Sequence, residues 1–142
     1  LSEFSKLVTR VRLPSPAQAR NGSYFHKQKE IMTDLSNSSC EACNNMTPKL
    51  TQSQAEELLS QLKGWELDQN NHLQKQWKFR GSITPKKFVD TIWEIANSRE
   101  VSHHPNISFT YGFVEVTIWT HAINGLSKND FILAAKIDTI TI

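Results

Sequence analysis

The histidines of this chain are concentrated in one stretch, where His103, His104 and His121 lie within nineteen residues. Imidazole titrates near neutral pH and can both donate and accept protons. Several imidazoles with almost no charge around them, and with no cysteine or carboxylate cluster beside them, are typical of general acid/base chemistry on a small polar molecule. A metal site is the competing interpretation, because neutral imidazole is also a common metal ligand.

The order of the elements around these histidines predicts that the three rings meet. Pro105 fixes its own φ and biases His104 away from helical dihedrals, so the His-His pair lies where a helix gives way to a strand. His121 follows the next strand, and a hairpin around Gly112 would place the two strand ends side by side, ~5 Å apart. Adjacent extended residues point to opposite sides, which favours separate roles for His103 and His104 over chelation of one metal.

Asp130 and Trp65 are further candidates, each with two interpretations. Asp130 occupies the third position of a predicted helix that begins after Ser127, where a carboxylate stabilises the helix start. The same carboxylate could also orient an imidazole or a substrate amine, and the two roles are compatible. Trp65 could belong to the core or form a stacking wall for a flat ring. The other two histidines, His26 and His72, are interpreted as surface or structural residues.

The elements that position these residues follow from the apolar periodicity. Three helices are predicted where capping residues precede apolar positions at helical spacing. They begin at Thr51, Thr84 and Ser127. Gly64 is expected to end the first helix. Two hairpins are predicted over residues 65–79 and 107–118. In the first hairpin, Lys75 interrupts the alternation of apolar and polar residues. The order α-β-β-α-β-β-α predicts an α+β fold, in which helices pack on one face of a four-stranded antiparallel sheet.

Length and charge limit the classes of protein that fit. At 142 residues and 38% hydrophobic, the chain is expected to form one compact domain with its own core. No apolar run reaches the roughly 18–20 residues of a membrane span, and the first residues lack the apolar region of a secretory signal. Residues 1–31 hold six Lys or Arg against two Glu, whereas residues 32–142 hold ten against twelve acidic residues. The domain is therefore not expected to bind nucleic acid or membranes, and a cytoplasmic location is predicted.

Three segments are expected along the chain. Residues 1–31 contain Arg, Ser and Pro without apolar periodicity, so a disordered leader is predicted. It is interpreted either as non-native sequence upstream of a start at Met32, or as a transit peptide, which would place the protein in the mitochondrial matrix. Residues 32–49 are expected to be a flexible N-terminal segment, and residues 50–142 the folded domain.

The two cysteines lie in that N-terminal segment, as Cys40-Glu41-Ala42-Cys43. A zinc ribbon needs a second pair of ligands, and a redox-active pair needs a preceding strand and a following helix. Neither accompanies these residues. Reduced surface thiols are therefore the favoured interpretation, with a zinc site that recruits histidines as the alternative.

The candidate residues together form a pattern that resembles the pterin-4a-carbinolamine dehydratases. After His103-His104-Pro105 come five residues and Tyr111, then nine and His121, then eight and Asp130. The resemblance runs from about Leu50 to Ile140 and includes Gly64-Trp65, Thr120-His121, Gly125-Leu126 and Ala134-Ala135. The family usually has an acidic or similar residue four places before the first histidine, where this chain has Arg99, followed by Glu100.

The resemblance implies an enzyme that dehydrates 4a-hydroxytetrahydropterin, the carbinolamine left by an aromatic amino acid hydroxylase, to quinonoid dihydropterin. It implies that His103 and His121 act as acids towards the hydroxyl group, and that His104 binds the pterin and acts as the base. Asp130 and Trp65 would line the same pocket, and no metal or cofactor would take part. A homodimer or homotetramer is implied, functionally coupled to that hydroxylase. The alternative is a non-catalytic binding module that serves as a dimerisation cofactor for a regulatory protein.

Overall fold

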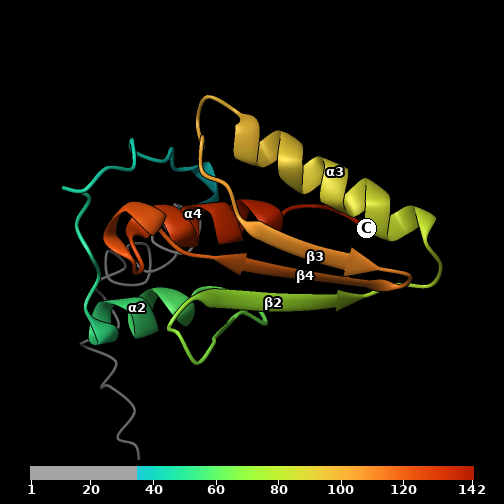
Figure 1. Ribbon diagram of the computed structural model, residues 1–142, viewed down its shortest axis with the longest axis horizontal. Coiled ribbons are helices and arrows are strands. Elements are labelled where there is room, and N and C mark those ends of the chain that lie inside the picture. The colour runs from blue at the N-terminus through green and yellow to red at the C-terminus, as the bar shows by residue number, and fades with distance from the viewer. Residues whose placement is uncertain (1–34) are drawn as a thin grey trace, which may run out of the picture. The chain divides into compact units, whose positions relative to one another are not determined.

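The computed structural model describes residues 35–142, and the leader predicted over residues 1–31 lies outside them. The main elements of the described part follow one another as Figure 1 shows. They are, in order, α2 (Gln52–Leu59), β1 (Glu66–Leu67), β2 (Leu73–Lys78), α3 (Ile83–Asn97), β3 (Asn106–Thr110), β4 (Phe113–Ile118), the 3-10 helix η2 (His121–Ile123) and α4 (Lys128–Ile137). Within residues 35–142, every helix is too short or too polar to span a membrane.

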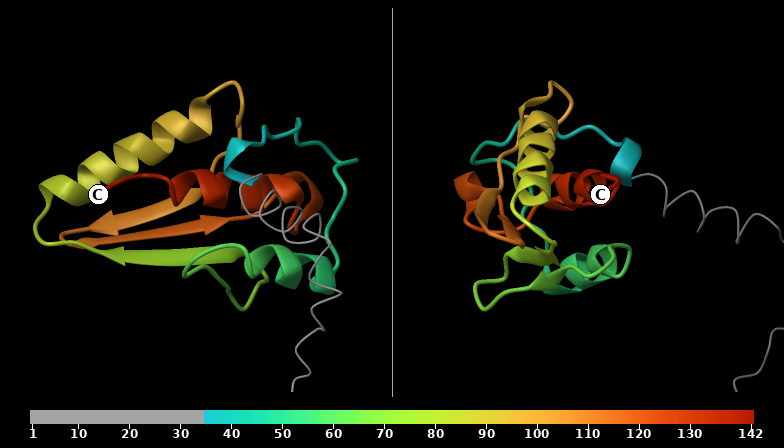
Figure 2. Two further views of the ribbon diagram at one scale, coloured as in Figure 1. Left: turned by 180° about the vertical axis from the view of Figure 1, so that it is seen from behind. Right: turned by 90° about the vertical axis from the view of Figure 1, so that its right-hand side faces the viewer.

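The strands of the described residues form one antiparallel sheet in the order β1-β2-β4-β3. Strand β2 pairs with β4 from Leu73 opposite Ile118 to Lys78 opposite Phe113, and β3 pairs with the other side of β4. Helices α3 and α4 lie on the same side of the strands, as the right-hand view of Figure 2 shows. The predicted α+β fold, with helices on one face of a four-stranded antiparallel sheet, is confirmed.

The inward face of the sheet and the facing sides of the helices form one hydrophobic core. Alternate residues of β4 are buried, and their partners across β2 continue the same face. The fully buried side chains at its centre are Leu73, Ile92, Val114, Val116, Ile118, Phe131 and Leu133. Period two in the strands and helical spacing in α3 and α4 bring these residues together, so burial of apolar surface holds the two layers to each other.

Lys75 belongs to the inward face of the sheet, but its charge does not enter the core. Its ammonium group reaches the carbonyl of Lys63 at 2.6 Å and the carboxylate of Asp138 at 2.5 Å. The same group lies 5.0 Å from the ring centroid of Trp77 and 5.7 Å from that of Trp65. The aliphatic stem therefore covers apolar surface while the charge stays paired, which explains the break in the predicted alternation.

The start of α2 follows the predicted capping box, whereas its end precedes the predicted stop. The N–H of Gln54 donates to the hydroxyl of Thr51 at 3.3 Å, and the N–H of Thr51 donates to the side-chain oxygen of Gln54 at 2.9 Å. The helix ends at Leu59, before Gly64. Gly64 has a φ of 70° in the turn that leads into β1, so its conformational freedom is used there.

The prediction that Thr84 caps α3 was wrong. The helix begins at Ile83 and follows Ser82, whose side chain makes no capping hydrogen bond. Pro85 therefore lies inside the first turn rather than at its first position. It is tolerated there because the first backbone N–H groups of a helix have no partner within the helix in any case.

Gly112 ties the hairpin of β3 and β4 to the end of β2. It has a φ of 72°, its carbonyl accepts the N–H of Phe79 at 2.8 Å, and its N–H donates to the carbonyl of Gly81 at 3.0 Å. A Cβ placed at Gly112 would lie 2.9 Å from the carbonyl oxygen of Phe79. Both the dihedral angle and the available space therefore require glycine.

Gly112→Ala is expected to lower the free energy of unfolding by about 2 kcal/mol or more, since it combines a left-handed φ with a contact to rigid backbone. Gly81→Ala is the matched control, because Gly81 has a φ of 93° but nothing within 4 Å of an added Cβ. The control should lose only about 1 kcal/mol. Urea unfolding followed by tryptophan fluorescence measures both variants. Equal losses would show that the contact with Phe79 has no effect.

Candidate active site

The carboxylate of Asp130 is fully buried and joins three parts of the chain. Its Oδ2 accepts the backbone N–H of Ser127 at 2.7 Å and the hydroxyl of Thr120 at 2.9 Å. Its Oδ1 lies 2.6 Å from Nε2 of His103. Because the hydroxyl of Thr120 donates to Asp130, it accepts the hydroxyl of Ser127 at 2.7 Å. The carboxylate therefore belongs to the start of α4 and is at the same time the partner of an imidazole.

His103 follows α3 through a turn in which Ser102 has a φ of 41°. Its side chain is only 7% exposed. A carboxylate accepts hydrogen bonds and donates none, so the hydrogen that faces Asp130 belongs to Nε2 of His103. Nδ1 is then the nitrogen that can take up or deliver a proton. It lies 3.5 Å from Sγ of Cys43.

His104 and His121 are exposed, and each has its own neighbours. Nε2 of His104 donates to the side-chain oxygen of Asn97 at 2.9 Å, and its ring lies 5.4 Å from that of Trp93. The ring of His121 lies 4.2 Å from that of Trp119, and its nitrogens have no hydrogen-bond partner among the residues that the structure describes. Both imidazoles therefore keep a nitrogen that can exchange a proton with a bound molecule.

The pairing of β3 with β4 brings the predicted histidines to the same end of the sheet. His103 and His104 precede β3, and His121 follows the end of β4. Thr120, the residue before His121, shares the carboxylate of Asp130 with His103. The three rings nevertheless have different partners, so their joint action on one molecule stays a prediction. In the described part of the chain, no group of three His, Cys, Asp or Glu side chains could hold a metal ion.

Two other positions singled out in the sequence lie away from this network of hydrogen bonds. Trp65 is 6% exposed in the core, where its ring meets that of Trp77 at 5.8 Å and its N–H donates to the carboxylate of Asp138 at 3.1 Å. This is one of its two predicted positions, and a role as a stacking wall stays a prediction. The carboxylate of Glu100 is 73% exposed and lies 4.0 Å from Nζ of Lys136.

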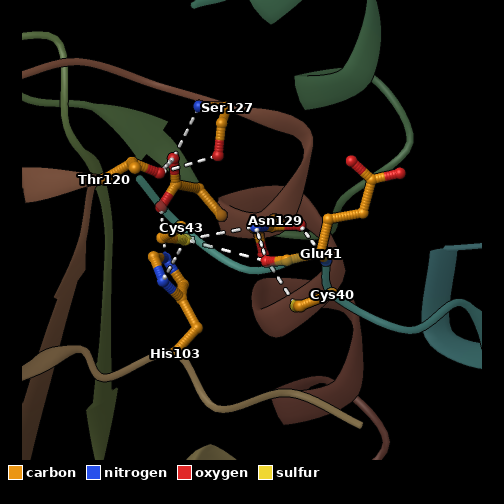
Figure 3. Close-up of polar contacts among 8 residues, drawn as sticks. Cys40, Glu41, Cys43, His103, Thr120, Ser127 and Asn129 are labelled. Carbon is orange, nitrogen blue, oxygen red and sulfur yellow. Dashed lines mark hydrogen bonds and ion pairs between the residues drawn. The ribbon is translucent and has the colours of Figure 1, made fainter. Parts of the chain in front are cut away.

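Residues 40–43, which we call the strap, cross the site from the N-terminal segment. Figure 3 shows the strap against Asn129 and His103. The side-chain oxygen of Asn129 accepts the N–H of Glu41 at 3.0 Å, and its Nδ2 donates to the carbonyl of Glu41 at 2.7 Å. The same Nδ2 lies 3.2 Å from Sγ of Cys43. The strap therefore rests on one amide at the start of α4.

Cys40 anchors the beginning of the strap and is a poor nucleophile. Its N–H donates to the carbonyl of Glu100 at 2.7 Å, and its thiol donates to the carbonyl of Asn129 at 3.7 Å. Burial raises the pKa of this thiol to about 11, and the neighbouring Cys43 adds to the increase. Cys40 therefore stays a thiol at neutral pH, whereas Cys43 is exposed.

The contacts of Cys43 and Asn129 were not predicted from the sequence. Sixty residues separate Cys43 from His103, and a polar segment carries no periodicity that could indicate where it packs. The one available signal was the position of Asn129 directly before Asp130, on the first turn of a predicted helix. Thr120 was noted only as part of the resemblance, without a partner.

The chain is thus a small α+β domain that carries a buried imidazole–carboxylate pair. The chain belongs to the pterin 4 alpha carbinolamine dehydratase family, whose model matches residues 48–140. The activity of that family is the loss of water from a pterin carbinolamine, which makes its members hydro-lyases of pterin recycling. The resemblance seen in the sequence is confirmed.

Individual relatives agree with this assignment. The chain is 38% identical over 109 residues to a protein of Rubrobacter xylanophilus and 42% identical over 109 residues to one of Rickettsia canadensis, both provisionally named pterin-4-alpha-carbinolamine dehydratase. These alignments cover 77% and 76% of this chain and 100% and 98% of the relatives. A crystal structure of a transcriptional coactivator/pterin dehydratase from Brucella melitensis is similar with a TM-score of 0.59 and 30% identity, over 64% of this chain and 96% of that one.

Iodoacetamide is expected to modify Cys43 well before Cys40 in the folded protein at pH 8. The thiolate is the reactive form, and a pKa of about 11 leaves about one Cys40 thiol in a thousand ionised at that pH. Peptide mass spectrometry after timed quenching measures the two rates. Unfolding in urea is the control and should bring the two rates close together. Equal rates in the folded protein would contradict the shielded position of Cys40.

Proposed function

We propose that this protein removes water from 4a-hydroxytetrahydropterin and releases quinonoid dihydropterin, by acid/base catalysis with histidine side chains. The observation that carries the proposal is the buried pair of His103 and Asp130, 2.6 Å apart, in a chain of this family. An imidazole that is held by a carboxylate at one nitrogen presents the other nitrogen for proton transfer.

The reaction needs an acid and a base at the same time. The hydroxyl group at C4a leaves as water when its oxygen receives a proton, and the new double bond between C4a and N5 forms when N5 loses one. The proton count balances, because water carries away the proton of the acid while the base holds the proton of N5. Both transfers are within the capacity of imidazole near neutral pH.

His103 and His121 are the proposed acids, one for each face of the pterin ring. Asp130 holds Nε2 of His103 and stabilises the imidazolium form, so that Nδ1 delivers the proton to the hydroxyl oxygen. Asp130 has no exposed surface, so in this proposal it acts through His103 and not on the substrate. His121 supplies the second acid, since it lies beside Trp119 and its nitrogens have no hydrogen-bond partner among the described residues.

His104 is the proposed base and a contact for the pterin. Asn97 takes the N–H at Nε2, which leaves the lone pair of Nδ1 for the proton of N5. Trp93 lies next to this imidazole and is 50% exposed, so it offers a flat apolar surface beside the base. A planar heterocycle that reaches His104 can pack against that surface.

The proposed partners follow from the substrate and from the sheet edge. An aromatic amino acid hydroxylase produces the carbinolamine, so the protein is proposed to act beside such an enzyme. Strand β3 is an edge of the sheet; Phe109 within it is 50% exposed, and Tyr111 just after it is 79% exposed. An edge strand with exposed aromatic side chains suits pairing with a second copy, in a homodimer or a homotetramer.

His103→Ala and His121→Ala are each expected to slow dehydration by about 10²-fold, a typical contribution of a general acid. The measurement follows the ultraviolet absorbance of the carbinolamine as a hydroxylase generates it, with and without the protein. Lys86→Ala is the control, because Lys86 lies on the exposed side of α3 and pairs with Asp90 at 2.6 Å. It should leave the rate unchanged. A folded wild-type protein that gives no acceleration would overturn the proposed function.

A second candidate function is that of a binding module for a regulatory protein. The observation that favours it is the description of the Brucella melitensis relative as a transcriptional coactivator as well as a pterin dehydratase. Proton transfer by His103 has no part in such a role. The two functions are therefore separable, because His103→Ala would slow dehydration and leave binding of the regulatory partner intact.

A further inference from the structure

The strap brings a thiol to the one nitrogen of His103 that the proposed reaction uses. Sγ of Cys43 lies 3.5 Å from Nδ1 of His103, while Asp130 occupies the other nitrogen at 2.6 Å. The family model matches residues 48–140, so the strap precedes the part of the chain on which the family assignment rests. The role of Cys43 must therefore be argued from its own contacts.

The directions of the hydrogen bonds follow from Asp130. Since Nε2 of His103 carries the hydrogen that faces the carboxylate, Nδ1 of the neutral ring is an acceptor and the thiol of Cys43 donates to it. When the ring is protonated, Nδ1 becomes a donor and the sulfur becomes the acceptor. Asn129 Nδ2, 3.2 Å from the sulfur, donates to it in either state. The pair can thus exchange one proton whenever the substrate does not occupy Nδ1.

The strap is held firmly enough to keep this geometry. Asn129 is only 4% exposed and binds Glu41 through both its oxygen and its nitrogen. The backbone of Cys40 is fixed to the carbonyl of Glu100 at 2.7 Å. Cys43 itself remains exposed at the surface. Its thiol consequently lies between His103 and Asn129 in a residue that solvent reaches.

We propose that Cys43 is a positioning residue for His103. Its thiol holds the imidazole in the form with the hydrogen on Nε2, and it passes a proton from solvent to Nδ1 after each turnover. In that step the S–H bond breaks, an N–H bond forms at Nδ1, and water reprotonates the sulfur, so no oxidant or reductant takes part. The relay rests on the proposed function, whereas the positioning of the ring does not.

The kinetic test compares Cys43→Ala with Cys43→Ser in the dehydration assay. Removal of the thiol is expected to lower kcat by about three- to ten-fold with little change in KM, the size of effect that one hydrogen bond to a reacting group gives. A serine hydroxyl can donate and accept at the same place, but it gives up its proton far less readily than a thiol. It should therefore keep the ring in position and restore only part of kcat. Met46→Ala is the matched control in the same segment, because Met46 is 90% exposed. Wild-type kinetics in Cys43→Ala would overturn the relay.

The second test does not depend on activity. The ¹⁵N resonance of His103 Nδ1, measured by long-range ¹H–¹⁵N correlation, is expected to shift in Cys43→Ala and to stay unchanged in Met46→Ala. An unchanged resonance in Cys43→Ala overturns the positioning role, whatever the kinetics show. A shifted resonance in a protein without dehydratase activity would support the positioning role and refute the proposed function, so the two failures are distinguishable.

Discussion

The structure depends on one buried carboxylate, that of Asp130. A carboxylate without exposed surface destabilises a fold by several kcal/mol unless donors replace its water, and here Ser127, Thr120 and His103 supply them. These donors come from the start of α4, the end of β4 and the turn after α3. The hydrogen bonds that make the burial tolerable therefore also fix where three elements meet, and that meeting point is the candidate site. Loss of any one donor would leave part of the charge unpaired and loosen all three elements.

The same constraint determines which way the neighbouring residues face. The N–H of Thr120 donates to the carbonyl of Gly125 at 2.9 Å and that of Gly125 to Thr120 at 3.4 Å, so the loop between β4 and α4 closes on itself. Within it, Asn124 has a φ of 44° and ends the short helix η2. Thr120 is thereby turned inward to the carboxylate, and the next residue, His121, is left on the surface beside Trp119. An inward threonine and an outward histidine are thus two results of one loop conformation.

Local patterns in the sequence predicted most of the fold because they act over a few residues. The capping box of Thr51 and Gln54 and the helix start at Ser127 depend on neighbours within four positions, and each hairpin pairs strands that follow one another in the chain. The position of Asp130 at the start of α4 was predicted for the same reason, whereas its contact with an imidazole was one of two interpretations that the sequence left open. The strap could not be predicted, because its contacts join Cys43 to residues sixty and more positions away, and a polar segment gives no indication of the surface on which it packs. The ion pair of Lys75 could not be predicted for the same reason, since its partner Asp138 is sixty-three positions away.

The first residues of α4 determine which groups lie beside the two nitrogens of the buried imidazole of His103. Asn129 and Asp130 are consecutive helical residues, so their side chains leave the axis about 100° apart. One reaches the strap and the other reaches the ring, which places a thiol at Nδ1 and a carboxylate at Nε2 of His103. The orientation of the imidazole is therefore determined by a single helix turn, whereas the exposed His104 is held at one nitrogen only, by Asn97.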